Sequence, residues 1–157
     1  MTESTGSAQY RIVVGVDGSD QARKALRWAA RLAGMFGARL DAVAAWEYPP
    51  TFGWSVVPDD WNPSEDTGKM LETTVAEVLG DQTPPGLQLD VREGVPARVL
   101  LDASKDAQLL VVGSRGHGGF AGLLLGSVSS NVAEHATCPV LIIHGDHQPP
   151  TMLTPGS

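Results

Sequence analysis

One stretch of the chain has the residue types and spacing that could hold phosphate. Residues 113–127 read GSRGHGGFAGLLLGS, with nine residues between Gly116 and Gly126. Because glycine lacks a Cβ atom, main-chain N–H groups beside it can approach phosphate oxygens closely. Ser127 and Ser129 add hydroxyl groups where a helix is expected to begin, and the unpaired N–H groups of a helix start favour an anion. The pattern therefore predicts a polyphosphate site.

A second polar turn follows the first apolar run. Asp17, Gly18 and Ser19 come directly after RIVVGV at residues 11–16, and helical spacing begins behind them. Asp-Gly favours turns, so two roles stay open for Asp17, as a turn residue or as a ligand contact. Ser19 is expected to cap the helix that follows.

The elements that must position these turns alternate between strand and helix patterns. Short apolar runs predict strands at 11–16, 40–46, 87–91, 109–112 and 140–143. We expect helices to begin at Ser19, Ser64, Pro96 and Ser127, with the serines as N-caps. This alternation predicts a single doubly wound α/β domain, a parallel sheet in three α/β/α layers with helices on both faces.

Apolar spacing also predicts which residues point inward. Gly37 is the expected stop of the first helix, whose inward face is Ala22, Ala25, Leu26, Ala29, Ala33 and Phe36. The expected inward face of the last helix is Val128, Val132, Ala133 and Ala136. The alternation of Leu87, Leu89 and Val91 predicts a strand with an exposed face or at a sheet edge.

A proline-rich segment at 47–63 interrupts the pattern and predicts a long loop. Aromatic residues gather in and beside it: Trp46, Tyr48, Phe52, Trp54 and Trp61. We expect Trp46 to pack on the domain. For Trp54 and Trp61, packing and a role as a lid or partner surface stay equally open.

Length, charge and cysteine content limit the classes of protein that fit. The 157 residues suit one domain, expected at 10–145 between flexible ends at 1–9 and 146–157. The net charge of −7 repels phosphate backbones, so nucleic acid is not an expected partner. Cys138 is the single cysteine, which fits a reducing compartment. With no apolar run typical of a signal peptide or a membrane span, we expect a cytoplasmic protein that does not associate with membranes.

Together these motifs resemble the universal stress protein family, in its ATP-binding branch. That branch has Gly, two residues, Gly, nine residues, then Gly and Ser or Thr, and Gly113, Gly116, Gly126 and Ser127 match it. The opening VDGS turn and the closing TCPVLII run also resemble motifs of the family. The similarity extends over about residues 10–144.

The resemblance implies a Rossmann-like fold of the adenine nucleotide alpha hydrolase type, with strand order 3-2-1-4-5. The two polar turns would then meet over one crevice. It implies ATP as the ligand, with Mg²⁺ or Mn²⁺ bound through the phosphates. The implied contacts are Gly15, Val16, Asp17, Gly18 and Ser19 in the first turn, Ala45 at the adenine edge, Val112 and Gly113 beside the nucleoside, and Gly116, Gly126, Ser127, Val128 and Ser129 around the phosphates. Arg115 lies where the family varies, and its contact with phosphate is our own hypothesis.

The class of function stays open between a binding module and a slow enzyme. We expect a nucleotide-dependent module in stress response or signalling, and AMP or cyclic AMP could occupy the same adenosine site. Because no P-loop ending in Gly-Lys-Ser/Thr and no kinase motif is present, slow ATP hydrolysis or phosphotransfer is the alternative. We expect no catalytic residue and no metal cage, and His117 is interpreted as an exposed loop residue. The resemblance also implies a homodimer formed through the last strand.

Overall fold

A five-stranded parallel sheet forms the centre of the structure, a computed structural model that describes residues 10–48, 58, 60–116, 125–146 and 148–149. The strands are β1 (Arg11–Gly15), β2 (Arg39–Trp46), β3 (Gln88–Glu93), β4 (Leu109–Gly113) and β5 (Val140–Ile143). Their order across the sheet is β3-β2-β1-β4-β5, with every neighbouring pair parallel. The predicted order is therefore confirmed.

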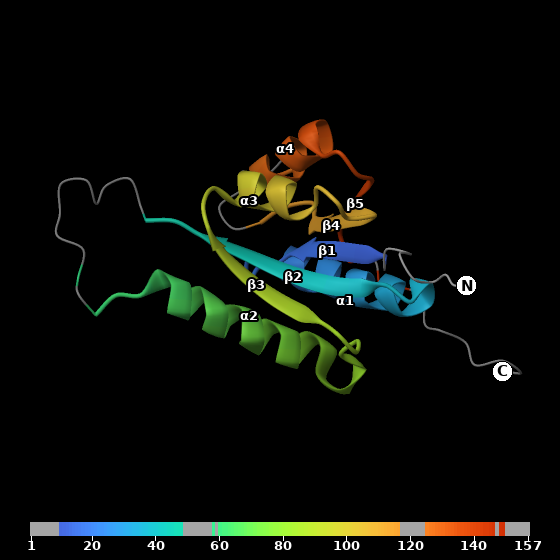
Figure 1. Cartoon of the computed structure of the whole chain (residues 1–157), viewed down its shortest axis with the longest axis horizontal. Helices are drawn as coiled ribbons and strands as arrows, with labels where there is room; N and C mark the ends of the chain where they lie inside the picture. Colours follow the sequence, from blue (N-terminus) through green and yellow to red (C-terminus); the bar gives the residue numbers. More distant parts are fainter. Residues whose placement is uncertain (1–9, 49–57, 59, 117–124, 147, 150–157) are drawn as a thin grey trace, which may run out of the picture.

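Helices cover both faces of this sheet. α1 (Asp20–Phe36) and α2 (Pro63–Leu79) lie on one face, and α3 (Pro96–Ala103) and α4 (Ser127–His135) lie on the other (Figure 1). A short 3₁₀ turn, η2 (Gly80–Gln82), follows α2. The predicted three-layer α/β/α arrangement is confirmed.

The central strand shows why its sequence is continuously apolar. Ile12 and Val14 pack with residues of α1 and α2, whereas Val13 packs with residues of α3 and α4. All three are at most 1% exposed. Because successive strand residues point to opposite faces, a strand covered on both sides needs apolar side chains at every position.

The first helix begins and ends where its sequence predicts. The Ser19 side chain accepts a hydrogen bond from the Ala22 N–H, and Gly37 closes the helix in the left-handed conformation with φ of 64°. The predicted inward residues are buried except the last one. Phe36 is 59% exposed, so that prediction was wrong. It sits on the final turn, at the end of the apolar face.

Two other predicted helix caps were also wrong. Asn62 caps α2 by accepting from the Glu65 N–H, so Ser64 lies inside the helix. Gly126 is the N-cap of α4, and Ser127 is its first residue. Ala133 is exposed, because the nine residues of α4 bury mainly Ser129 and Val132. Spacing locates such helices, but the capping residue depends on the path of the incoming chain.

The outer part of the sheet carries an aromatic cluster. Trp46 and Tyr48 meet edge to face at 5.3 Å, and Tyr48 and Trp61 do so at 5.5 Å. Trp46 and Trp61 therefore both contact Tyr48, a residue of the proline-rich segment. Phe52 and Trp54 lie outside the described residues. β3 forms the edge beyond β2, as its alternating pattern predicted.

Charged side chains meet at the amino end of β1 and β2. The Asp41 carboxylate accepts hydrogen bonds from Arg11 Nη1 at 3.0 Å, from Arg39 Nε at 2.9 Å and from Arg39 Nη2 at 2.9 Å. Arg11 also donates to the Ala103 carbonyl at 3.0 Å, which ties the network to α3. Burial alone would raise the pKa of Asp41, but the two arginines outweigh it and hold that pKa below its ordinary value of 3.8.

The two ends of the chain fall mostly outside the described residues, including 1–9 and 150–157. At the start of the predicted tail, Asp146 pairs with Lys24 of α1, and the Gly145 carbonyl accepts from the same ammonium at 3.0 Å. In the described part of the chain, no helix combines the length and apolar character of a membrane span.

Candidate functional site

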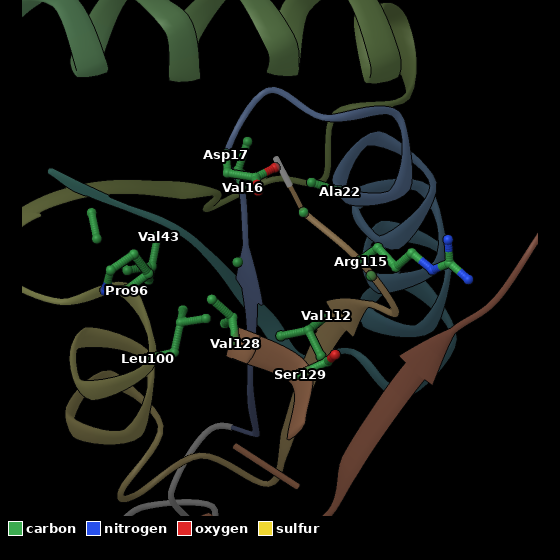
Figure 2. Close-up of a pocket in the computed structure, with 14 residues that line it drawn as sticks. Val16, Asp17, Ala22, Val43, Pro96, Leu100, Val112, Arg115, Val128 and Ser129 are labelled. Carbon is green, nitrogen blue, oxygen red and sulfur yellow. The ribbon is translucent and has the colours of Figure 1, made fainter. Parts of the chain in front are cut away.

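The candidate site lies where the strand order reverses. β1 and β4 are neighbours, yet the chain continues from β1 to β2 on one side and from β4 to β5 on the other. A cavity opens at their carboxyl ends, bordered by the starts of α1, α3 and α4 (Figure 2). Ligands of open α/β sheets bind in such crevices.

Most of the predicted contact residues line this cavity. They are Gly15, Val16, Asp17, Ala45, Val112, Gly113, Arg115, Gly116, Val128 and Ser129. The remaining predicted residues, Gly18, Ser19, Gly126 and Ser127, belong to the adjoining turns and are not part of its lining. The two polar turns are therefore brought together, as expected from the strand order.

Four lining residues were not predicted: Ala22, Val43, Pro96 and Leu100. Val43 could have been found, because it lies two residues before Ala45 and so faces the same side of β2. Pro96 and Leu100 come from α3, and no local pattern connects that helix with the cavity. Their contribution depends on how α3 packs across the sheet.

Asp17 is held in a tight turn at the mouth of the cavity. Its Oδ1 atom accepts hydrogen bonds from the Ser19 N–H at 2.9 Å and from the Ser19 hydroxyl at 2.5 Å. Gly18 between them has φ of 83°, a conformation that favours glycine. Asp17 thus has the turn role that its sequence suggested, and its carboxylate also borders Gly116.

The glycines of the motif meet different neighbours. A Cβ atom on Gly116 would come closer than 3.0 Å to the Asp17 carboxylate, the far end of a flexible side chain. A Cβ atom on Gly113 would lie 2.7 Å from the main-chain carbon of Gln21 in α1. Gly113 is therefore required for the packing of α1 against β4. The missing side chain of Gly116 leaves its main chain accessible to a ligand beside Asp17.

The two ends of the glycine-rich segment are joined at Ser114. The Ser114 carbonyl accepts from the Gly126 N–H at 2.7 Å and from the Ser129 hydroxyl at 2.8 Å. The Ser114 N–H donates to the Ile143 carbonyl of β5 at 2.8 Å. These contacts fix the start of α4 beside the end of β4. Sequence reasoning missed Ser114, which carries no signal of its own.

Few formal charges border the cavity. Asp17 and Arg115 are the charged residues in its described lining. Arg115 is exposed, and in Figure 2 its side chain points away from Leu100, Val128 and Ser129. Among the described residues, no group of three His, Cys, Asp or Glu side chains could hold a metal ion. His117 lies outside the described residues.

Comparison with known proteins identifies the family. The model of the Universal stress protein family matches residues 10–144. The chain belongs to the universal stress protein family.

Two mycobacterial relatives are close in sequence to this member of the family. Universal stress protein Rv2623 of Mycobacterium tuberculosis is 38% identical over 152 residues, which cover 91% of this chain and 50% of the relative. A universal stress protein of Mycolicibacterium smegmatis is 35% identical over 149 residues, covering 90% of this chain and 50% of the relative. The chain thus spans about half the length of these relatives.

Solved structures of the family share the fold. A universal stress protein in complex with cAMP is 30% identical with a TM-score of 0.61, over 88% of this chain and 98% of that one. The universal stress protein of Archaeoglobus fulgidus in complex with dAMP is 25% identical with a TM-score of 0.57, over 85% of this chain and 96% of that one. Both of those relatives were solved with adenine nucleotides bound.

Proposed function

We propose that this universal stress protein binds ATP in the cavity between β1 and β4 and acts as a nucleotide-dependent module in stress response or signalling. One observation carries the proposal. Three helix starts, in α1, α3 and α4, converge on the carboxyl ends of three strands at a single cavity. Helix starts carry positive dipole ends, and the start of α4 has no side-chain cap, so its N–H groups favour an anionic ligand there.

Main-chain donors suit a protein of this charge. The net charge is −7, so the overall field does not attract a nucleotide. The main-chain N–H groups of Gly116 and of the start of α4 act at short range, where the charge of the whole surface matters less. The phosphate chain would lie across the glycine-rich segment, near Gly116, Gly126 and Ser127.

The inner part of the cavity suits a base. Val43, Ala45, Pro96 and Leu100 supply apolar walls there. The cavity holds about 70 Å³, below the ~300 Å³ of typical small-molecule pockets. We assign the apolar part of this cavity to the base, with the phosphates toward Gly116 and the start of α4.

A divalent cation fits this site only as a partner of the phosphates. Asp17 is the carboxylate in the described lining, and one carboxylate is fewer than the oxygen ligands that Mg²⁺ requires. Phosphate oxygens and water would supply the remaining ligands. Mg²⁺ or Mn²⁺ is thus expected to strengthen ATP binding and to bind weakly without nucleotide.

A nucleotide panel tests the proposal. Titration calorimetry would compare ATP, AMP, cyclic AMP and GTP, each with and without Mg²⁺, on protein stripped of nucleotide. We expect ATP with Mg²⁺ to bind tightest and GTP weakest. Tighter binding of AMP or cyclic AMP would move the assignment to those ligands, which the cAMP and dAMP complexes of relatives support as the second candidate. Absence of binding by every adenine nucleotide would refute it.

We also propose that the protein forms a homodimer through β5. β5 is an edge of the described sheet, and Val140, Leu141 and Ile142 are only partly buried. An unpaired apolar edge strand favours pairing with another chain. Light scattering at micromolar concentration should give twice the chain mass of 16.5 kDa. A monomer mass there would contradict the dimer.

A further inference from the structure

Three serines in the first turn of α4 differ sharply in their surroundings. Ser127 and Ser130 are exposed, whereas Ser129 is only 2% exposed. In Figure 2, Ser129 lies beside Val112 of β4 and away from Asp17. A hydroxyl that is buried in this way is expected to have a fixed partner.

The partners of the Ser129 hydroxyl are main-chain carbonyls. Its Oγ atom is 2.8 Å from the Ser114 carbonyl oxygen and 3.1 Å from that of Gly126. A hydroxyl has one proton, and the shorter distance directs it to Ser114. The Gly126 N–H donates to the same Ser114 oxygen at 2.7 Å. One carbonyl at the end of β4 therefore receives two donors from the start of α4.

This carbonyl is itself held in place. Ser114 is 5% exposed, and its N–H is bonded to Ile143 of β5. The hydrogen bond from the Ser129 hydroxyl therefore holds the start of α4 against the end of β4. Gly116 follows Ser114 in the chain, and Gly126 precedes Ser129, so the two glycines lie on either side of this bond. The position of α4 relative to the end of β4 determines whether the main-chain N–H groups of Gly116 and Ser127 can reach one phosphate chain.

We propose that Ser129 is a positioning residue whose hydroxyl joins the two ends of the glycine-rich segment before any ligand arrives, and is not itself a phosphate ligand. This inference rests on the proposed nucleotide site. It changes the role that the family resemblance implied for the Ser129 side chain. Only its main-chain N–H, at the start of α4, stays available for the phosphates. Holding Gly126 beside the end of β4 in advance lowers the conformational cost of binding.

Amide hydrogen exchange and nucleotide titration of the full chain test this together. In nucleotide-free protein, Ser129→Ala should speed exchange of the Gly126 amide about tenfold, because the second donor to Ser114 is lost. The same variant should weaken ATP binding by about tenfold. Ser127→Ala should weaken ATP binding without changing that exchange rate, and Ser130→Ala should change neither.

The outcomes separate this inference from the proposed function. Unchanged Gly126 exchange in Ser129→Ala, combined with weaker ATP binding, would make the hydroxyl a ligand and overturn the inference. If no nucleotide binds to any variant, the proposed function fails, and the exchange rates still decide whether the hydroxyl holds the segment. Ser129→Cys keeps the side-chain size with a weaker donor, and serves if Ser129→Ala is poorly folded.

Discussion

At the amino end of the sheet, charged side chains from β1 and β2 meet, whereas at the carboxyl end glycines and helix starts meet. Asp41, Arg11 and Arg39 satisfy one another at the first end, with the side chain of Asp41 only 9% exposed. At the second end, the cavity is lined mostly by apolar side chains and main chain. The amino ends of β1 and β2 are thus stabilised by side-chain charges, whereas the carboxyl end of the sheet keeps main-chain donors near a cavity.

The amino end of the sheet therefore contributes to stability, and the carboxyl end contributes to ligand binding. The charged groups of this network pair with one another, so they hold the strands together rather than bind a ligand. Helix starts and glycine turns offer N–H groups, and they need no compensating charge on the surface. We therefore expect substitutions at the amino end to change stability and substitutions around Gly116 to change binding.

The largest expected effect is on nucleotide binding by Gly116→Val. The added side chain would displace the Asp17 carboxylate and fill the approach to the main chain. We expect ATP affinity to fall about 100-fold, equivalent to about 2.7 kcal/mol, with little change in melting temperature. Calorimetric titration and thermal unfolding measure the two quantities.

Gly113→Val is the matched control, because its clash is with the main chain of α1 at Gln21. It should lower the free energy of unfolding by about 3 kcal/mol. If Gly116→Val destabilised the protein as much as Gly113→Val while ATP affinity stayed the same, both glycines would serve packing alone. Gly126→Val is expected to affect both properties, because a Cβ atom there would lie 3.3 Å from the main-chain Cα atom of Arg115.

Asp41→Asn tests the amino end. The substitution removes the negative charge and one of the two acceptor oxygens that Arg11 and Arg39 share, and should lower the free energy of unfolding by about 2 kcal/mol. ATP affinity should be unchanged. Asp90→Asn is the control, since Asp90 pairs with Arg92 on the surface, and it should cost less than about 1 kcal/mol. If chemical denaturation gave equal losses of unfolding free energy for Asp41→Asn and Asp90→Asn, burial of the Asp41 network would not contribute to stability.

Ser19→Ala should have a smaller effect, because it removes one helix cap. The Ala22 N–H would lose its acceptor, lowering the free energy of unfolding by about 1 kcal/mol. Ser19 also donates to Asp17, so ATP binding should weaken modestly. Ser19→Thr keeps the hydroxyl and should restore both properties. Failure of Thr to restore either would point to a packing role for the residue.

The smallest effect is expected in the pH dependence of stability. The pKa of Asp41 in the folded protein lies below its ordinary value of 3.8, so its contribution is present above that pH and is lost as the pH falls through the folded pKa. The stability difference between wild type and Asp41→Asn should therefore shrink below about pH 4 and stay constant above it. A difference that grew on acidification would contradict the assignment.

Part of the site was predictable because its signals are local. Asp17, Gly18 and Ser19 form a turn that adjacent residues determine, and they form it in the structure. The helix caps were harder to predict. The N-caps of α2 and α4 are Asn62 and Gly126, where Ser64 and Ser127 were expected. Capping depends on the direction from which the chain enters each helix.

The alternation of strands and helices, the glycine spacing and membership of the family can be read from the sequence, since each of these is a pattern along the chain. The positions of Pro96 and Leu100 at the cavity, and the two donors from Gly126 and Ser129 to the Ser114 carbonyl, follow from the packing of the folded chain. These contacts join segments that are distant in sequence. They depend on how the helices pack on the sheet, which the spacing of residues along one segment does not encode.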